Sequence, residues 1–301
     1  MLKNVSLTLP QNYQHRATIG KILVHLLLLA FSIVALIPFV MLLAGSFSSE
    51  NAIATKGYSL LPQDASFQAY QFILADPAQI FNSYFITITV TLGGGSGGLL
   101  VMSLLAYALS RKDFALHKLL AFYVFFTMLF NGGLVPWYIL ITQYLHLKDN
   151  ILALILPTMV VPWFVLLLRT YFSGLPSELI EAAKIDGAGE WRIFFKVVVP
   201  LSTPALATVG LFLVLNYWND WWLALLFIDD KKLVPLQYLL YTIQSNIDAL
   251  STDPNLVSGG PIPAITVRLA MAVLAIGPII FAFLFAQKYF VRGVTLGGVK
   301  E

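Results

Sequence analysis

The chain has 301 residues, of which 58% are hydrophobic and 11% are charged, and its formal net charge is +3. A soluble domain has about 25% charged residues, so this composition excludes an ordinary soluble domain and places the chain in a lipid bilayer. The small net charge gives no reason to expect nucleic acid as a partner. The absence of cysteine excludes disulfides and thiolate metal sites.

Six apolar stretches approach the roughly 20 residues needed to cross the hydrocarbon core of a bilayer. We therefore predict an all-α membrane protein that forms a single domain over residues 1–301. The expected spans lie near residues 22–47, 83–110, 119–145, 151–172, 201–228 and 264–287. The first stretch is too long and too weakly marked at its end for a cleaved secretion signal, so we expect it to stay as a helix.

Two long segments between expected spans are expected to lie outside the membrane. Residues 48–80 and 229–263 are polar and rich in turn-forming residues, and each is too short for a stable domain of its own.

A run of glycines lies in the second expected span, where residues 93–98 read Gly-Gly-Gly-Ser-Gly-Gly. Small residues let membrane helices approach closely, and we favour that role over a local break in the helix that lines a pathway. The run lacks the Lys-Ser/Thr pair of a phosphate-binding loop.

The third span is interrupted at residues 131–136, which read Asn-Gly-Gly-Leu-Val-Pro. Pro136 removes a backbone donor and paired glycines loosen a helix, so we expect a break there. It is either a structural kink or a bend beside the substrate path.

A charged loop at residues 176–200 separates the fourth and fifth spans. Ser177 is expected to cap a helix of about nine residues that begins at Glu178, and Gly187 is expected to end it in the left-handed conformation. Ala182 and Ala183 are small enough to let this helix sit in a groove of another protein.

A second helical segment is expected from Glu190 onward. The spacing of its larger apolar residues predicts that they share one face, and these residues are Trp191, Phe194, Phe195 and Val198.

The spacing of the loop resembles the "EAA" loop of ATP-binding-cassette (ABC) importer permeases, which reads Glu-Ala-Ala, three residues, Gly, nine residues, Ile, one residue, Leu-Pro. Here Val197 and Val199 replace the Ile and the Leu. The resemblance implies a MetI/MalG-like fold in which this loop contacts a separate ATPase. The implied ATPase-coupling residues are Glu181, Ala182, Ala183, Asp186, Gly187 and Pro200.

Further segments resemble the carbohydrate-uptake permeases of the MalG and LplC kind, and they cover most of the chain from the second span onward. They are residues 130–136, 154–157, 217–222 and 287–293. The resemblance implies a second, MalF- or LplB-like permease, two ATPase subunits that bind ATP and Mg, and an extracytoplasmic solute-binding protein. It implies no cofactor in this chain.

Aromatic and amide side chains near the end of the fifth span are candidates for the substrate path, because rings stack on sugars and amides bond their hydroxyls. The candidates are Asn131, Tyr217, Trp218, Asn219, Asp220 and Trp222. Aromatic residues also gather at membrane boundaries, and we favour a boundary or packing role. Asp220 is the exception, because an acid near the bilayer is costly; Arg268 is its candidate partner or a contact for the binding protein.

Basic residues predict the orientation of the chain. Thirteen of the 18 lysines and arginines fall on the side of the termini, four fall in the opposite loops, and Arg268 lies at the last span. Both termini and the 176–200 loop are therefore expected in the cytoplasm of a bacterial cell.

These features favour a permease subunit of an ABC importer for sugars, with oligosaccharides, including uronate-containing ones such as alginate fragments, as the expected cargo. The nearest alternative is an ABC permease for another solute. A secondary transporter would need charged relays inside several spans. A membrane enzyme would need a metal cluster or an activated nucleophile, and the sequence indicates neither.

Overall fold

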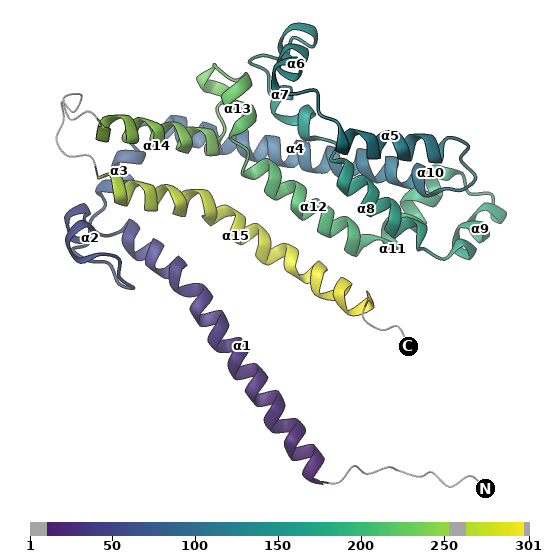
Figure 1. The fold of residues 1–301 in the computed structure, drawn as a ribbon, viewed down its shortest axis with the longest axis horizontal. Helices are drawn as coiled ribbons and strands as arrows, with labels where there is room; N and C mark the ends of the chain where they lie inside the picture. The colour runs from purple at the N-terminus through teal and green to yellow at the C-terminus, as the bar shows by residue number, and fades with distance from the viewer. Residues whose placement is uncertain (1–10, 253–262, 298–301) are drawn as a thin grey trace. The chain divides into compact units, whose positions relative to one another are not determined.

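The structure is a computed structural model that describes residues 11–252 and 263–297. Within those ranges every regular element is a helix and no strand is present. The longer helices are α1 (Gln11–Ser46), α4 (Pro77–Ser110), α5 (His117–Leu129), α8 (Pro162–Ser173), α12 (Thr203–Trp218), α14 (Leu236–Thr252) and α15 (Ala264–Gly297) (Figure 1). The shorter α-helices are α2 (Glu50–Lys56), α3 (Gln68–Ile73), α6 (Leu134–Ile139), α7 (Leu152–Ile155), α9 (Ser177–Ile185), α10 (Glu190–Ile193), α11 (Val199–Leu201) and α13 (Trp222–Phe227). The remaining elements are the π-helices η1 (Leu140–Tyr144) and η3 (Phe194–Val198) and the 3₁₀ turns η2 (Leu156–Thr158) and η4 (Lys231–Leu233).

The chain forms two compact units. The first unit runs to Ile73 and takes in the start of α15 as far as Val273, and the second unit holds the rest. In the first unit, the Glu50 carboxylate accepts hydrogen bonds of 2.9 Å from the backbone N–H groups of Ile265 and Thr266. An acid at a helix N-terminus satisfies orphan donors and complements the helix dipole, so α2 anchors the beginning of α15.

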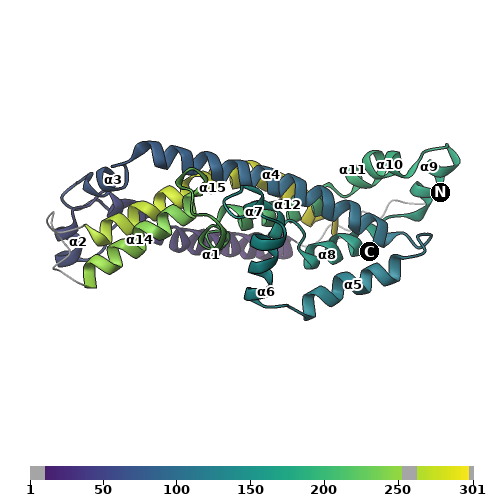
Figure 2. The same ribbon diagram turned by 90° about the horizontal axis from the view of Figure 1, so that it is seen from above.

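The second unit is built around α4. Helices α8 and α12 pack along it, and α14 packs near its N-terminal half (Figure 2). The core between these helices is apolar and close to fully buried. It includes Met102, Ala106, Val165, Leu168, Val209 and Leu213.

The glycine run of residues 93–98 lies inside α4, which continues through it without a break. A Cβ atom on Gly98 would lie 2.7 Å from the carbonyl oxygen of Met159, and one on Gly94 would meet the ring of Tyr217. The prediction of close helix packing is therefore confirmed, and the alternative of a broken helix is wrong.

The N-terminal end of α4 is tied to the segment that follows α13. The amides of Gln79 and Asn82 donate hydrogen bonds to the backbone carbonyls of Lys231 and Lys232, at 2.9 and 2.8 Å. Nearby, the Asp149 carboxylate accepts from two successive backbone N–H groups, those of residues 229 and 230, at 2.6 and 2.8 Å. Those two bonds hold the pKa of Asp149 below its ordinary value.

Three described helices are long and apolar enough to cross a membrane. They are the Gly20–Ser46 part of α1, α4, and the Ala264–Phe281 part of α15. Three further helix pairs meet the same criteria only if each bent pair counts as one span, which gives up to six. The count of six therefore stays a prediction. The fifth expected span differs in detail, because its helix α12 ends at Trp218 and α13 begins after a break.

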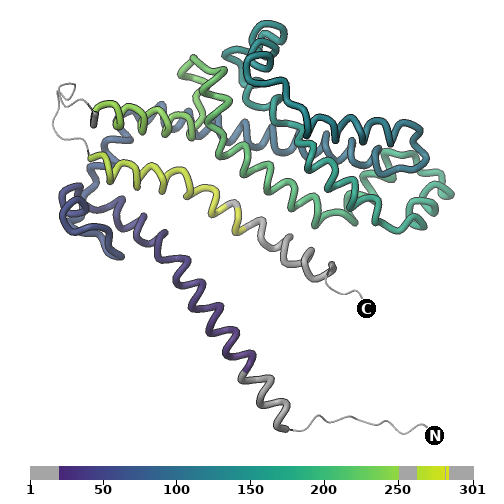
Figure 3. The backbone as a smooth tube through the Cα atoms, viewed as in Figure 1, coloured from purple at the N-terminus to yellow at the C-terminus, as the bar shows by residue number. Residues whose placement is uncertain are grey.

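The predicted break in the third span is confirmed. Helix α5 ends at Leu129, and the chain bends by 116° before the helical segment that starts at Leu134 (Figure 3). Gly133 has a φ of 86°, and its N–H donates to the Asn131 side chain at 2.8 Å. The break thus precedes Pro136, which lies within α6 rather than at the bend.

The two large segments between spans contain more helix than the sequence suggested. Residues 48–80 hold α2 and α3, and residues 229–252 hold η4 and the 17-residue α14. The inward residues of α14 are Leu236, Leu240 and Ile247, whose spacing of four and seven places them on one helix face. Residues 253–262 of the same segment lie outside the described residues.

The glycine contact makes a direct prediction for two neighbouring positions. Gly98→Ala should lower the stability of the purified protein by about 1–3 kcal/mol, because its methyl group meets a backbone carbonyl. Gly93→Ala is the matched control, since its Cβ would lie 3.6 Å from a methyl group of Ile155 and alanine favours helix by up to about 1 kcal/mol. Thermal unfolding in detergent measures both. Equal midpoints for the two variants would contradict the packing role.

Candidate functional site

Helix α9 is the predicted loop helix, and it has the expected nine residues. It begins at Ser177 itself, with Pro176 at the N-cap position and no side-chain capping bond, so the expectation that Ser177 caps it is wrong. The helix ends at Ile185, and Gly187 has a φ of 75°. That confirms the left-handed turn. The backbone N–H of Ala188 donates to the carbonyl of Ala183 at 2.9 Å, which closes the helix end in the manner of a glycine C-cap.

The two faces of α9 have different surroundings. Ile180 and Ala183, three residues apart, pack against the core of the second unit. Glu181 and Ala182 are exposed, and the Glu181 side chain makes no hydrogen bond or ion pair with any described residue. Ala183 is half-buried and seats the helix on its own protein, whereas Ala182 is exposed; the ATPase-coupling role of both alanines stays a prediction.

Asp186 and Pro200 lie at the two ends of this part of the loop. Asp186 is the C-cap of α9, and its N–H donates to the carbonyl of Ala182 at 3.0 Å. Pro200 lies in α11, just before an 84° bend that leads the chain into α12. The chain therefore turns directly after Pro200 and Leu201 into α12.

The segment from Glu190 does not present its apolar residues on one face. Phe194 and Val198 are buried, whereas Trp191 is 68% exposed and Phe195 is 48% exposed. The rings of Trp191 and Phe195 stack on each other with centroids 6.1 Å apart. The prediction of a shared face fails because residues 194–198 form a π-helix, whose wider turn separates residues that an α-helix would align.

Charged side chains connect this loop to the end of α4. The Arg111 guanidinium donates two hydrogen bonds to the Asp113 carboxylate, at 3.1 and 2.8 Å. Lys184 of α9 reaches the same carboxylate at 2.6 Å and Glu190 at 3.3 Å. Glu190 also accepts a hydrogen bond from the Tyr107 hydroxyl. We call these five residues the loop–α4 cluster.

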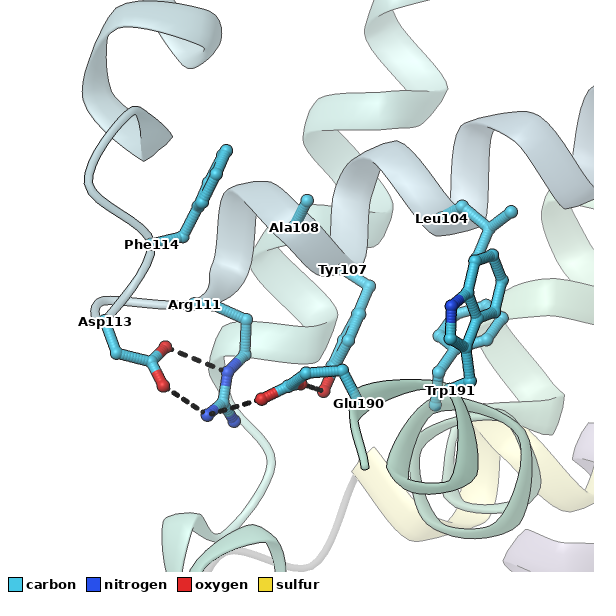
Figure 4. Close-up of a pocket in the computed structure, with 9 residues that line it drawn as sticks. Leu104, Tyr107, Ala108, Arg111, Asp113, Phe114, Glu190 and Trp191 are labelled. Carbon is cyan, nitrogen blue, oxygen red and sulfur yellow. Dashed lines mark hydrogen bonds and ion pairs between the residues drawn. The ribbon is translucent and has the colours of Figure 1, made fainter. Parts of the chain in front are cut away.

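Four members of the loop–α4 cluster appear in Figure 4, where dashed lines join Asp113, Arg111, Glu190 and Tyr107 in a chain. The hydrogen bonds from Arg111 and then Lys184 hold the pKa of the Asp113 carboxyl well below its usual range, so it stays ionised at neutral pH. Sequence reasoning missed this cluster because Lys184 and Asp113 are 71 residues apart, and no spacing rule relates them.

A mostly apolar hollow of about 460 Å³ lies beside the cluster. Figure 4 shows Leu104 and Trp191 at one side of it and the charged groups of Arg111 and Asp113 at the other.

Two of the candidate path residues are buried in the bundle. Tyr217 is 3% exposed and its hydroxyl donates to the carbonyl of Ile155 at 2.8 Å. Trp218 is 5% exposed and its indole N–H donates to the carbonyl of Ala275 at 2.9 Å. Both side chains thus serve packing in this structure, which was the favoured interpretation.

The other candidates line two open hollows that share Trp222. One, of about 680 Å³, includes Asn131. The second, of about 580 Å³, includes Asn219 and Asp220 together with Asn216 and Trp221. The Asp220 carboxylate also accepts from the N–H of Leu223 at 2.9 Å, at the start of α13. Arg268 belongs to the first unit, where it is exposed on α15.

Comparison with known proteins gives a family and several relatives. The family model described as "Binding-protein-dependent transport system inner membrane component" matches residues 20–296. The chain is 38% identical over 279 residues to a polygalacturonan/rhamnogalacturonan transport system permease protein, YtcP, of Bacillus subtilis (strain 168), covering 92% of this chain and 97% of the relative. It is 34% identical over 267 residues to protein LplC of the same organism, covering 89% and 90%.

A solved structure has the same architecture. It is a chain of a bacterial ABC transporter involved in the import of the acidic polysaccharide alginate, with a TM-score of 0.73 and 29% identity. The match covers 95% of this chain and 100% of that chain. An arabinooligosaccharides transport system permease protein, AraQ, of Bacillus subtilis (strain 168) is 31% identical over 291 residues, covering 94% of this chain and 97% of the relative.

Proposed function

The chain belongs to the family of binding-protein-dependent transport system inner membrane components, and on that premise we propose that it is a transmembrane permease subunit of a bacterial ABC importer for oligosaccharides. It crosses the inner membrane and converts ATP hydrolysis by a separate ATPase into alternating access of a path for the sugar. Both termini and the α9 loop face the cytoplasm, as the distribution of basic residues indicates.

The outward face of α9 carries this proposal. Glu181 and Ala182 are exposed there, no described residue of the chain engages Glu181, and Gly187 turns the backbone sharply after the helix. Nine helical residues extend about 14 Å, which is long enough to seat in a cleft of another protein. An exposed acid and a small residue side by side suit docking against a basic, close-fitting surface.

The partners follow from the division of labour within such an importer. The sequence contains no Walker A pattern, so ATP and Mg bind to two ATPase subunits that dock below the membrane. A second permease, of the MalF or LplB kind, completes the path. A solute-binding protein docks on the external side, where Arg268 and the segment of residues 229–263 are its proposed contacts.

The cargo is proposed from the relatives and from the hollows together. YtcP is named for polygalacturonan and rhamnogalacturonan, and the solved structure concerns the import of alginate. All three polymers contain acidic sugars, so we propose uronate-containing oligosaccharides as the cargo. The hollows beside Trp222 offer rings for stacking on sugar faces and amides for bonding hydroxyls.

The function is tested by assembling the importer. The chain should co-purify with a second permease and an ATPase. Binding proteins loaded with oligogalacturonates or alginate oligosaccharides should stimulate ATP hydrolysis more than those loaded with neutral arabino-oligosaccharides. Absence of any ATPase from the complex would overturn the importer, whereas stimulation by neutral sugars alone would overturn only the acidic cargo.

The coupling role predicts loss of transport from changes on α9 and at its end. Glu181→Lys reverses the charge on the outward face and should abolish uptake and weaken ATPase association, while the subunit stays in the membrane. Gly187→Ala should reduce uptake, because a left-handed conformation costs a non-glycine residue about 1–2 kcal/mol. Gly189→Ala is the control, since Gly189 has a φ of −72° and open space around it. Wild-type uptake in both Glu181→Lys and Gly187→Ala would rule the role out.

If the sugar passes through the hollows, removing side chains that line them should weaken the apparent affinity for the sugar. Trp222→Ala and Asn219→Ala should each raise the apparent KM for uptake by about fivefold or more, the change that accompanies a loss of about 1 kcal/mol. Trp163→Ala is the matched control, because Trp163 is 60% exposed and lines neither hollow. Unchanged values for Trp222→Ala and Asn219→Ala would leave these residues with packing roles only.

A further inference from the structure

Helix α9 contacts the bundle through its side chains as well as through the backbone on either side of it. Its inner residues Ile180 and Ala183 give it an apolar seat, and Lys184 adds an ionic contact to Asp113 at 2.6 Å. Asp113 follows the end of α4 by three residues. The contact therefore joins α9 directly to the helix around which the second unit is built.

Arg111 makes the far end of this contact stiff. Its side chain is 15% exposed, and it grips Asp113 with two N–H groups at 3.1 and 2.8 Å. A two-point guanidinium–carboxylate pair fixes direction as well as distance. The Asp113 carboxylate therefore keeps its orientation when Lys184 is displaced.

Glu190 braces the loop on the other side of the left-handed turn. It lies 3.3 Å from Lys184, which precedes Gly187, and it accepts a hydrogen bond from Tyr107 of α4. The cluster thus spans the turn at Gly187. The glycine would otherwise be the natural hinge between α9 and α10, and the brace makes both sides of it move together.

We infer that the loop–α4 cluster is a strut that carries the displacement of α9 to α4, with Tyr107, Arg111, Asp113, Lys184 and Glu190 as positioning residues of the transport cycle. This inference rests on the proposed function, because α9 is displaced only if an ATPase binds it. Without the strut, only the apolar seat of Ile180 and Ala183 and the chain on either side would join α9 to the bundle, and movement of α9 would bend the loop at Gly187.

The cluster is better suited to transmission than to stability. Ion pairs with exposed members each contribute little to folding, and Asp113, Lys184 and Glu190 are all substantially exposed. Its geometry nevertheless fixes two segments that are far apart in sequence. Arg111 is largely buried over the Tyr107 ring, which packs in turn against the Phe194 ring, and this gives the geometry a rigid base.

Conservative variants test the strut in the assembled importer. Lys184→Met and Tyr107→Phe should lower the sugar taken up per ATP hydrolysed by about 2- to 30-fold, the range expected for changes along a coupling route, while the ATPase stays bound and active. Matched controls are Lys112→Met and Tyr123→Phe, because the side chains of Lys112 and Tyr123 make no hydrogen bond or ion pair with any described residue. Wild-type coupling in Lys184→Met and Tyr107→Phe would overturn the strut.

A covalent replacement separates transmission from a general effect on folding. The chain has no cysteine, so Asp113→Cys with Lys184→Cys introduces a unique thiol pair, to be studied with cysteine-free partner subunits. The double variant should be uncoupled, and a short bifunctional thiol reagent should restore coupling, because a strut needs only a stiff link. Failure of the cross-linked form to recover would overturn the strut.

The distance between α9 and the end of α4 can be measured directly, which tests the strut without an uptake assay. Spin labels at Glu178→Cys and Lys112→Cys should keep the same separation with and without ATP in the assembled importer, since the strut moves both sites together. In the Lys184→Met background the separation should change on ATP binding. A separation that changes equally in both backgrounds would overturn the strut, whereas a complex without ATPase would refute the proposed function itself.

Discussion

Close contact between α4 and its neighbours at the glycine run is the constraint on which the second unit depends. Gly94 and Gly98 leave no side chain between the α4 backbone and, respectively, the Tyr217 ring and the Met159 carbonyl. The absence of side chains brings α12 and the η2 turn against α4. It also places the Tyr217 hydroxyl where it can donate to the Ile155 carbonyl. Membrane helices gain stability from such packing, because lipid supplies no hydrophobic force between them.

Both ends of α4 are held by polar contacts from distant segments. At one end Gln79 and Asn82 bind the backbone that follows α13, and at the other Tyr107 and Arg111 engage the loop that carries α9. A helix clamped in this way can transfer movement between its ends without bending. Both hollows include Trp222, which follows the end of α12, and α12 packs along α4. The proposed ATPase contact and the proposed sugar path are therefore mechanically connected by one rigid element, as a two-state switch requires.

Helix α9 in the loop of residues 176–200 has one face packed on its own protein and one face that is exposed. Ile180, Ala183 and Lys184 hold α9 in place, whereas Glu181 and Ala182 remain outward. In the proposed function the exposed first two positions of Glu-Ala-Ala dock on the ATPase, whereas Ala183 packs on the core and Lys184 contacts Asp113 after the end of α4. The cargo is the less constrained part of the proposed function, because open hollows lined by rings and amides suit many sugars.

The sequence by itself determined the membrane environment, the helical class, the break in the third span, the nine-residue loop helix and its left-handed Gly187, because each follows from local composition or backbone preference. Its pattern also indicated the family. Only the tertiary structure decided which face of α9 is free, that a π-helix separates Trp191 and Phe195 from Phe194, and that Tyr217 and Trp218 are packed rather than open. It alone showed that Lys184 meets Asp113. Such contacts depend on how segments far apart in the chain come together, and no local spacing encodes that.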